Sequence, residues 1–246
     1  MVPVPDSPRF FCDAPLTSGA VVSLPERAAR HVAVLRLKVG DAVTLFSGDG
    51  NESSGTLVQI SKRGVVAAVR NRRAADRESP LVIHLAQSVC AGDKMDFVLQ
   101  KATELGVATI QPLVTQRSIV RISGERQEQR KTHWQNVVVA ACEQCGRNRI
   151  PPVMPTLAFA DFLEERRTPE GTRVVLVPDG DRSLREITPI APITVLVGPE
   201  GGLTGDERAL AVEAGFLAIR FGPRILRSES APLAALAALQ ALYGDC

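Results

Sequence analysis

Short stretches of alternating apolar and polar residues fill the first 70 positions of the chain, and this is the period of half-buried strands. Turns such as GDGN (48–51) separate the stretches. The expected strands are AVVSLP (20–25), AVTLFSG (42–48), SGTLVQIS (54–61) and GVVAAVRN (64–71), with a helix, PERAARHVAVLR (25–36), between the first two. The pattern predicts a small β-barrel. The charged stretch RNRRAADRESP (70–80), which ends in proline, is the expected linker.

After residue 80 the pattern changes to apolar strands that alternate with longer amphipathic helices. The expected strands are LVIHLAQSV (81–89), TIQPLVT (109–115), RVVLVPDG (173–180), ITVLVGPEGG (193–202) and AIRFG (218–222). The expected helices are KMDFVLQKATELGV (94–107), a helix of about 20 residues through 127–145, ERALAVEAGF (207–216) and APLAALAALQALYG (231–244). This alternation predicts an open α/β domain with a mostly parallel sheet. Ligands bind such sheets beyond the carboxyl ends of the strands.

The turn GPEGG (198–202) connects an expected strand to an expected helix, for which Thr204 is the N-cap and Glu207 its capping-box partner. Glycine-rich turns in this position often bind phosphate through backbone N–H groups. However, no lysine follows, as a Walker loop requires, and the glycine spacing does not fit the dinucleotide fingerprint. Glu200 would also place a carboxylate against the phosphate. The turn is therefore expected to hold something other than a polyphosphate.

The composition, 45% hydrophobic and 23% charged, is that of an ordinary soluble protein. The chain has no uncharged apolar run long enough to span a membrane and no signal-peptide pattern at its start, so a cytoplasmic location is expected. Charge is distributed unevenly: residues 1–79 carry 11 Lys and Arg against 8 Asp and Glu, residues 80–153 carry 9 against 6, and residues 154–246 carry 9 against 13. The basic first two thirds weakly favour a nucleic-acid partner, although an ordinary solvated surface explains the charge equally well.

The cysteines and histidines do not form a metal-binding pattern. Cys142 and Cys145 make a CxxC motif, but it lies within a helical run and has no second ligand pair. Free thiols are expected, with a redox or metal site as the alternative. His31, His84 and His133 match no metal-ligand spacing, so no metal is expected.

Two C-terminal motifs are more specific than composition or periodicity. VGPEGGLTGDE (197–207) and GPRILRSESAPLAALAALQ (222–240) resemble the RsmE family of 16S ribosomal RNA uracil-N3 methyltransferases, which belongs to the SPOUT class. The resemblance covers nearly the whole chain, because further motifs follow in order: PRFF (8–11), HVAVLRLKVGD (31–41), QKATELGV (100–107), RSIVRISGER (117–126) and ACEQCGRNRIP (141–151). It implies a PUA-like, RNA-binding β-barrel over residues 1–72 and an α/β SPOUT methyltransferase domain with a C-terminal trefoil knot over 73–246.

The resemblance implies S-adenosylmethionine as cofactor, which has a positive sulfonium and no phosphate. Exposed backbone groups of the glycine turn can hydrogen-bond an adenine edge and a ribose, and a carboxylate is acceptable beside a cation. The family's binding residues fall on Val197, Gly198, Pro199, Glu200, Gly201, Gly202, Ile225, Leu226, Arg227, Ser228, Ser230 and Ala231. The sequence departs from the family by having serine at 228 and 230, where threonine is usual, and by having Pro178-Asp179-Gly180 in a loop that is usually different. A ligand role for that loop is therefore left open.

Methyl transfer to uracil N3 is an in-line displacement that depends mainly on positioning the two reactants. The N3 proton must also leave, and a carboxylate could accept it while an arginine stabilises charge on the flanking carbonyl oxygens. Arg227 and Glu229, beside the predicted cofactor loop, are the candidate catalytic residues. The alternative for Glu229 is that it only caps the following helix.

The substrate that the resemblance implies is a uridine of 16S ribosomal RNA in the small ribosomal subunit, and a homodimer is expected by analogy with SPOUT enzymes. The candidate RNA-contacting residues are Arg9, Arg30, Arg36, Lys38, Lys101, Arg147 and Arg149. Other interpretations stay open: a phosphate-using hydrolase or kinase, a catalytically silent RNA-binding module, or a methyltransferase that acts on another RNA position or on a ribose 2′-OH.

Overall fold

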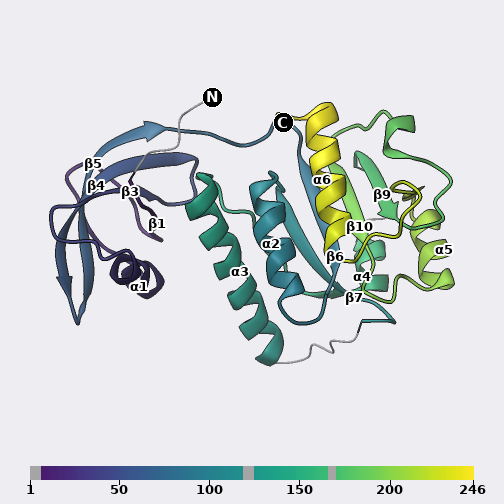
Figure 1. Cartoon of the computed structure of the whole chain (residues 1–246), viewed down its shortest axis with the longest axis horizontal. Coiled ribbons are helices and arrows are strands. Elements are labelled where there is room, and N and C mark those ends of the chain that lie inside the picture. Colours follow the sequence, from purple (N-terminus) through teal and green to yellow (C-terminus); the bar gives the residue numbers. More distant parts are fainter. Residues whose placement is uncertain (1–6, 119–124, 166–169) are drawn as a thin grey trace. The chain divides into compact units, whose positions relative to one another are not determined.

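The computed structural model of the chain describes residues 7–118, 125–165 and 170–246 (Figure 1). The chain divides into two compact units, one made of residues 1–78 and 139–150 and the other of residues 79–138 and 151–246. Most of the RSIVRISGER motif, residues 119–124, lies outside the described residues. In the described part of the chain, no helix is long and apolar enough to cross a membrane.

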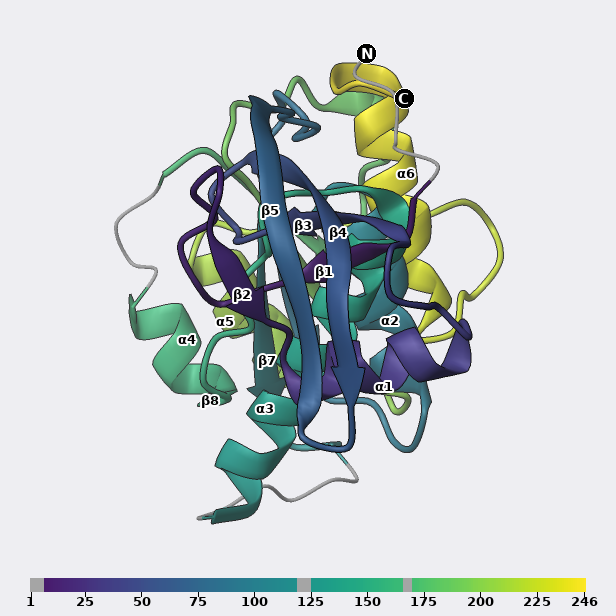
Figure 2. The same ribbon diagram turned by 90° about the vertical axis from the view of Figure 1, so that its left-hand side faces the viewer.

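Among its described residues, the first unit contains a five-stranded sheet of order β1-β3-β4-β5-β2, one complete helix, and the last part of helix α3 (Glu125–Cys145) (Figure 2). Its elements are β1 (Arg9–Phe11), β2 (Val21–Ser23), α1 (Glu26–Val34), β3 (Ala42–Phe46), β4 (Asn51–Ser61) and β5 (Gly64–Ala74). Strands β1 and β3 pair in parallel and the other pairs are antiparallel. Alternate residues of the strands face a core with Phe10, Leu45, Leu57 and Ala67. The expected strands and helix of this region are confirmed, each within a few residues.

The expected linker is wrong over residues 70–74, because these residues continue strand β5. The pairing with β4 reaches Ala74, opposite Asn51. Arg72 is paired with Asp49 and Arg73 with Glu52, so the charge that suggests a solvated linker is neutralised by carboxylates across the hairpin.

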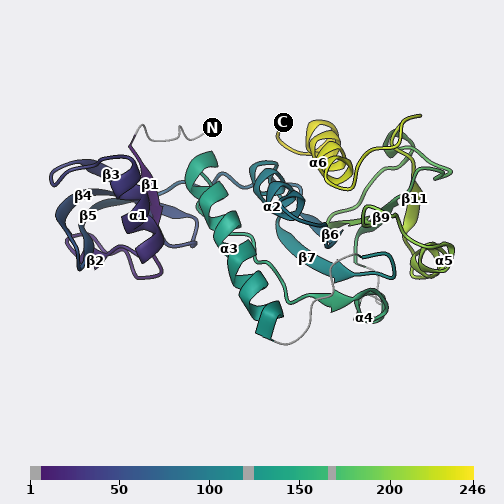
Figure 3. The same ribbon diagram turned by 60° about the horizontal axis from the view of Figure 1, so that its bottom comes forward.

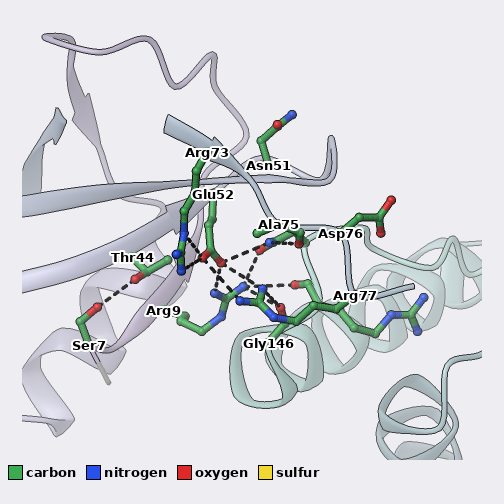
Figure 4. Close-up of polar contacts among 12 residues, drawn as sticks. Ser7, Arg9, Thr44, Asn51, Glu52, Arg73, Ala75, Asp76, Arg77 and Gly146 are labelled. Carbon is green, nitrogen blue, oxygen red and sulfur yellow. Dashed lines mark hydrogen bonds and ion pairs between the residues drawn. The ribbon is translucent and has the colours of Figure 1, made fainter. Parts of the chain in front are cut away.

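The buried carboxylate of Glu52 binds several side chains where β4 begins and β5 ends (Figure 4). Arg9 donates to Glu52 Oε2 at 2.7 Å, Arg77 at 3.0 Å and Asn148 at 3.2 Å, while Arg73 donates to Oε1 at 2.6 Å. Burial acts to raise the pKa of Glu52, but these hydrogen bonds outweigh it and lower the pKa to about 2. The same cluster joins strands β1, β4 and β5 to the loop that follows helix α3.

The second unit is a six-stranded sheet of order β11-β9-β10-β6-β7-β8, in which every pairing is parallel. Its strands are β6 (Ile83–Ser88), β7 (Thr109–Val114), β8 (Leu157–Ala158), β9 (Thr172–Leu176), β10 (Ile193–Val197) and β11 (Leu217–Ile219). Its helices are α2 (Lys94–Glu104), α4 (Phe159–Glu165), the short 3₁₀ helix η1 (Leu184–Glu186), α5 (Gly205–Glu213) and α6 (Ser230–Tyr243). Helix α3 (Glu125–Cys145) begins in this unit and ends in the first.

Helices cover both faces of this sheet, α2 and α6 on one face and α4 and α5 on the other (Figure 3). Strand β10 is buried at all five positions, which explains its continuous apolar sequence. The expected parallel α/β architecture is confirmed. The short pair β8 and α4, between residues 157 and 165, was not expected, because its few apolar positions show no clear period. The trefoil knot stays a prediction.

We predict that Glu52→Gln destabilises the protein, because it leaves the buried guanidinium of Arg9 without its carboxylate. The expected loss in the free energy of unfolding at pH 7 is about 3 kcal/mol, measured by urea denaturation followed by circular dichroism. Because the pKa of Glu52 is lower in the folded than in the unfolded chain, this stabilisation is complete above pH about 4.5 and disappears as pH falls towards about 2.

Asp76→Asn is the matched control for this prediction, since Asp76 is half exposed and its distance to Arg149 is 3.5 Å. We expect it to change the free energy of unfolding by less than about 0.5 kcal/mol. Equal losses in the two variants would contradict the role assigned to Glu52.

Candidate active site

A cleft of about 480 Å³ opens at the carboxyl edge of the parallel sheet in the second unit. The loops that follow β9, β10 and β11 supply most of its lining, and Arg117, after β7, and Arg208, in α5, complete it. It contains eleven of the twelve residues predicted to bind cofactor: Val197, Gly198, Pro199, Glu200, Gly201, Gly202, Ile225, Leu226, Arg227, Ser228 and Ala231. The twelfth, Ser230, lies outside this lining as the first residue of α6, where its side chain is exposed. The structure therefore brings two distant sequence motifs together.

The turn after β10 is tightly built. A Cβ on Gly198 would lie 3.0 Å from the backbone nitrogen of Leu203, and Gly202 has a φ of +68°, in the region that glycine adopts without strain. The predicted capping box is confirmed: the Glu207 N–H donates to Thr204 Oγ1 at 3.2 Å and the Thr204 N–H donates to Glu207 Oε2 at 2.9 Å. The turn thus leads directly into helix α5.

The loop after β9 completes one wall of the cleft. Pro178 and Asp179 line it, so the structure places at the cleft the loop whose role the sequence left open. A Cβ on Gly180 would lie 2.6 Å from the backbone nitrogen of Arg220, hence only glycine allows the chain after β11 to pass so closely. Asp179 is paired with Arg208 of α5 at 2.9 Å, and this hydrogen bond is the main reason that its pKa lies below the usual value.

Glu200 turns its carboxylate towards the start of helix α2. Its Oε1 accepts from the Ala91 N–H at 3.0 Å and from Lys94 Nζ at 3.3 Å. Burial acts to raise the pKa of Glu200, but the hydrogen bonds from Ala91 and Lys94 outweigh it and hold the pKa below its usual value. Its other oxygen, Oε2, is buried and has no hydrogen-bond partner among the described residues. The carboxylate is therefore ionised and has an acceptor available for a ligand.

Glu229 lies next to this pair. Its carboxylate is 3.7 Å from Lys94 Nζ, and Oε2 accepts from Ser228 Oγ at 3.2 Å. It occupies the N-cap position of α6 without a side-chain capping hydrogen bond, which counts against the alternative that it only caps the helix. The buried Cys90, which follows β6, lies close to Glu200, Glu229 and Lys94, and burial raises the pKa of its thiol.

Besides Arg208, two further arginines line the cleft. Arg227 has an exposed side chain, as a group that meets a substrate requires. Arg117, in the loop after β7, donates to the backbone oxygen of Gly201 at 2.8 Å. A Cβ on Gly201 would lie 3.3 Å from the Arg117 side chain. Glycine at this position therefore leaves space for Arg117, and the backbone conformation itself does not require glycine.

Sequence reasoning missed several cleft residues: Leu176, Val177, Leu203, Arg208 and Arg117. It also missed Lys94, which pairs with the cleft residue Glu200. Leu176 and Val177 lie at the end of β9, and the rule that parallel strands share a carboxyl edge could have included them. Arg117 and Lys94 carry no local signal, because only the packing of other strands and helices brings Arg117 to the cleft and Lys94 to Glu200. Among the described residues, no group of three or more His, Cys, Asp and Glu side chains is placed to hold a metal ion.

The candidate RNA-contacting residues divide into two groups. Arg9 and Arg147 are both 5% exposed, Arg9 bound to Glu52 and Arg147 to Glu78. Their burial argues against contact with phosphate, because a buried guanidinium would have to leave a carboxylate partner first. The others have accessible side chains: Arg30, Arg36, Lys38 and Arg149 in the first unit are exposed, and Lys101 in the second is half-buried beside Glu104.

Comparisons with known proteins agree with this geometry. Residues 77–240 match the family of RNA methyltransferase domains, and residues 24–69 match the family of RNA methyltransferase PUA domains. Ribosomal RNA small subunit methyltransferase E of Buchnera aphidicola (strain Sg) is 33% identical over 97% of both chains. That of Bacillus subtilis is 32% identical over 96% of this chain and 99% of its own.

Solved structures are similar over the same length. The structure of ribosomal RNA small subunit methyltransferase E from Neisseria gonorrhoeae, bound to S-adenosyl methionine, has a TM-score of 0.92 and 43% identity, and the match covers 97% of this chain and 99% of that one. A methyltransferase from Legionella pneumophila, in complex with the same cofactor, has a TM-score of 0.93 and 37% identity over 98% and 99% of the two chains. The resemblance seen in the sequence motifs is therefore confirmed, and this chain belongs to the RsmE family of ribosomal RNA small subunit methyltransferases.

Proposed function

We propose that this protein transfers a methyl group from S-adenosylmethionine to N3 of one uridine in 16S ribosomal RNA of the small ribosomal subunit. The observation that carries the proposal is the cleft at the carboxyl edge of the sheet, where the GPEGG turn and the RILRSESA segment (224–231) lie together. The relatives' names support the substrate class, and two similar structures contain the cofactor. Since ribosomes are the site of action, the cytoplasm is the proposed location.

The residues of the cleft fit this cofactor. The partnerless Oε2 of Glu200 would recover its lost hydrogen bond, about 1–3 kcal/mol, from a hydroxyl or amino group of a ligand. The close contact at Gly198 shows that the turn has no room for a side chain, so a ligand would meet backbone groups there. No lysine follows the glycine turn, as a Walker loop requires, which disfavours the hydrolase or kinase alternative. When bound, the cofactor supplies an electrophilic methyl group on a cationic sulfur.

The chain's own groups supply positioning and proton transfer. N3 of uracil carries a proton at neutral pH, and this proton must leave as the N3–methyl bond forms. We assign Glu229 as the acceptor, because its carboxylate lies beside the cation Lys94 and follows Ser228, which lines the cleft. We assign Arg227, exposed in the cleft, to the uracil carbonyl oxygens, where negative charge grows as the proton departs.

The proposed RNA surface uses accessible cations: Arg30, Arg36, Lys38 and Arg149 of the first unit and Lys101 of the second. We further propose that the enzyme is a homodimer. Helix α6 buries Ala235, Leu236 and Leu239 within the unit but leaves Leu242 51% exposed and Tyr243 38% exposed. These exposed apolar side chains are available for a second copy of the chain.

The central test is a map of modified uridines in small-subunit RNA from cells with and without the gene, read by mass spectrometry. Loss of a single N3-methyluridine is the expected result. An unchanged map contradicts the proposed function, and loss of a 2′-O-methyl group would instead support the alternative acceptor.

Substitution of Gly198 tests the cofactor turn. We expect Gly198→Ala to weaken S-adenosylmethionine binding at least about tenfold, or about 1.4 kcal/mol, because the new methyl group would displace the turn at Leu203. Gly205→Ala is the matched control, since a Cβ there meets nothing within 4 Å. Both affinities are measured by isothermal titration calorimetry. An unchanged affinity in Gly198→Ala would remove the turn from the binding site.

The catalytic assignments are tested by turnover. Arg227→Ala and Glu229→Gln are each expected to lower kcat by about a hundredfold or more, with cofactor affinity largely kept. Arg220→Ala, an exposed arginine just before the same loop and outside the cleft, serves as control and should keep wild-type turnover. Wild-type turnover in Arg227→Ala would end its proposed role.

The RNA surface predicts a salt-dependent affinity. Binding of small-subunit RNA should weaken steeply with salt, and Lys38→Ala should reduce the slope of log K against log salt by about 1. Arg185→Ala, an exposed arginine outside the proposed surface, should leave the slope unchanged. A flat salt response in the wild-type protein would count against the surface as a whole.

A further inference from the structure

One ammonium group joins two of the segments at the candidate active site, the turn after β10 and the start of α6. Lys94 Nζ lies 3.3 Å from Glu200 Oε1, in the turn after β10, and 3.7 Å from Glu229 Oε2, at the start of α6. Neither sequence motif contains Lys94, which belongs to helix α2. The two carboxylates come from separate loops, and Lys94 pairs with both.

The position of Lys94 within its own helix is unfavourable. It is the first residue of α2, where the partial positive charge of the helix dipole repels a cation. Asp93, at the N-cap, makes no side-chain capping hydrogen bond. Just before the helix, the backbone N–H of Ala91 donates to Glu200. Nothing in the helix itself therefore accounts for a lysine at this position, whereas the two carboxylates do.

The groups around Glu229 come from several elements. Lys94 faces it from α2 and the buried Cys90 thiol from the loop after β6, and Glu200 pairs with the same ammonium. Ser228 donates to Glu229 from the adjacent position. Among the described residues, Lys94 is the cation that forms an ion pair with Glu229.

We propose that Lys94 is a positioning residue for methyl transfer, whose ammonium is anchored by Glu200 and holds the Glu229 carboxylate in place for proton acceptance. The inference rests on the proposed function, because it assigns Lys94 to the same reaction. The ion pair restricts where the Glu229 carboxylate can lie, and transfer of the N3 proton depends on that placement. The ion pair with Glu200 holds the Lys94 ammonium in position beside Glu229.

The test compares Lys94→Met, Lys94→Arg and Lys131→Met with the wild-type protein. Lys131, in α3, forms none of the ion pairs around the cleft and serves as control. Turnover is measured as transfer of labelled methyl from S-adenosylmethionine to unmodified small-subunit RNA. Lys94→Met should lower kcat by about thirtyfold while the calorimetric Kd for S-adenosylmethionine changes less than about threefold, and Lys94→Arg should restore most of the loss because it keeps the charge. The melting temperature should change little, since the pair is partly exposed.

A further measurement separates positioning from a structural role. In a double-mutant cycle, Lys94→Met combined with Glu229→Gln should lose no more activity than Glu229→Gln alone.

Wild-type turnover in Lys94→Met, no recovery of turnover in Lys94→Arg, or fully multiplicative losses in the cycle would each overturn the proposal. These outcomes are distinct from failure of the proposed function. In that case the wild-type protein itself would bind no S-adenosylmethionine or transfer no methyl group to the RNA.

Discussion

Parallel pairing of β9, β10 and β11 is the constraint on which the candidate site depends. Because all three strands run in one direction, the loops that follow them emerge at the same edge of the sheet. The crowding at that edge is visible in two glycines, Gly198 and Gly180, at which a Cβ would meet neighbouring backbone. The cleft is therefore a consequence of strand direction. The positions of its walls depend on the close backbone contacts that Gly198 and Gly180 allow between neighbouring loops.

The charges of the chain serve mainly to join its own elements. In the first unit, Glu52 receives hydrogen bonds from three arginines, and Arg147 is bound to Glu78. A basic composition therefore overstates the positive charge that the surface presents to RNA. In the second unit, Lys94 neutralises Glu200 in the same way, so this carboxylate is no isolated negative charge beside the cofactor turn.

Much of the fold was accessible from pattern alone. Period-two alternation located the strands of the first unit, and apolar runs between amphipathic helices indicated the parallel sheet of the second. The linker prediction failed over residues 70–74, because arginines are expected in solvent unless their carboxylate partners are known. Of the predicted cofactor residues, only Ser230 lies outside the cleft lining, since it begins α6 with its side chain exposed.

The sequence by itself determined the features that depend on neighbouring residues: the glycine turn, the capping box of Thr204 and Glu207, and the motifs that identify the family. Only the tertiary structure decided which charges meet. The pairing of Lys94 with Glu200 and Glu229, and the burial of Arg9, join residues far apart in the chain. Such pairings depend on strand order and helix packing, and no short window of sequence contains that information.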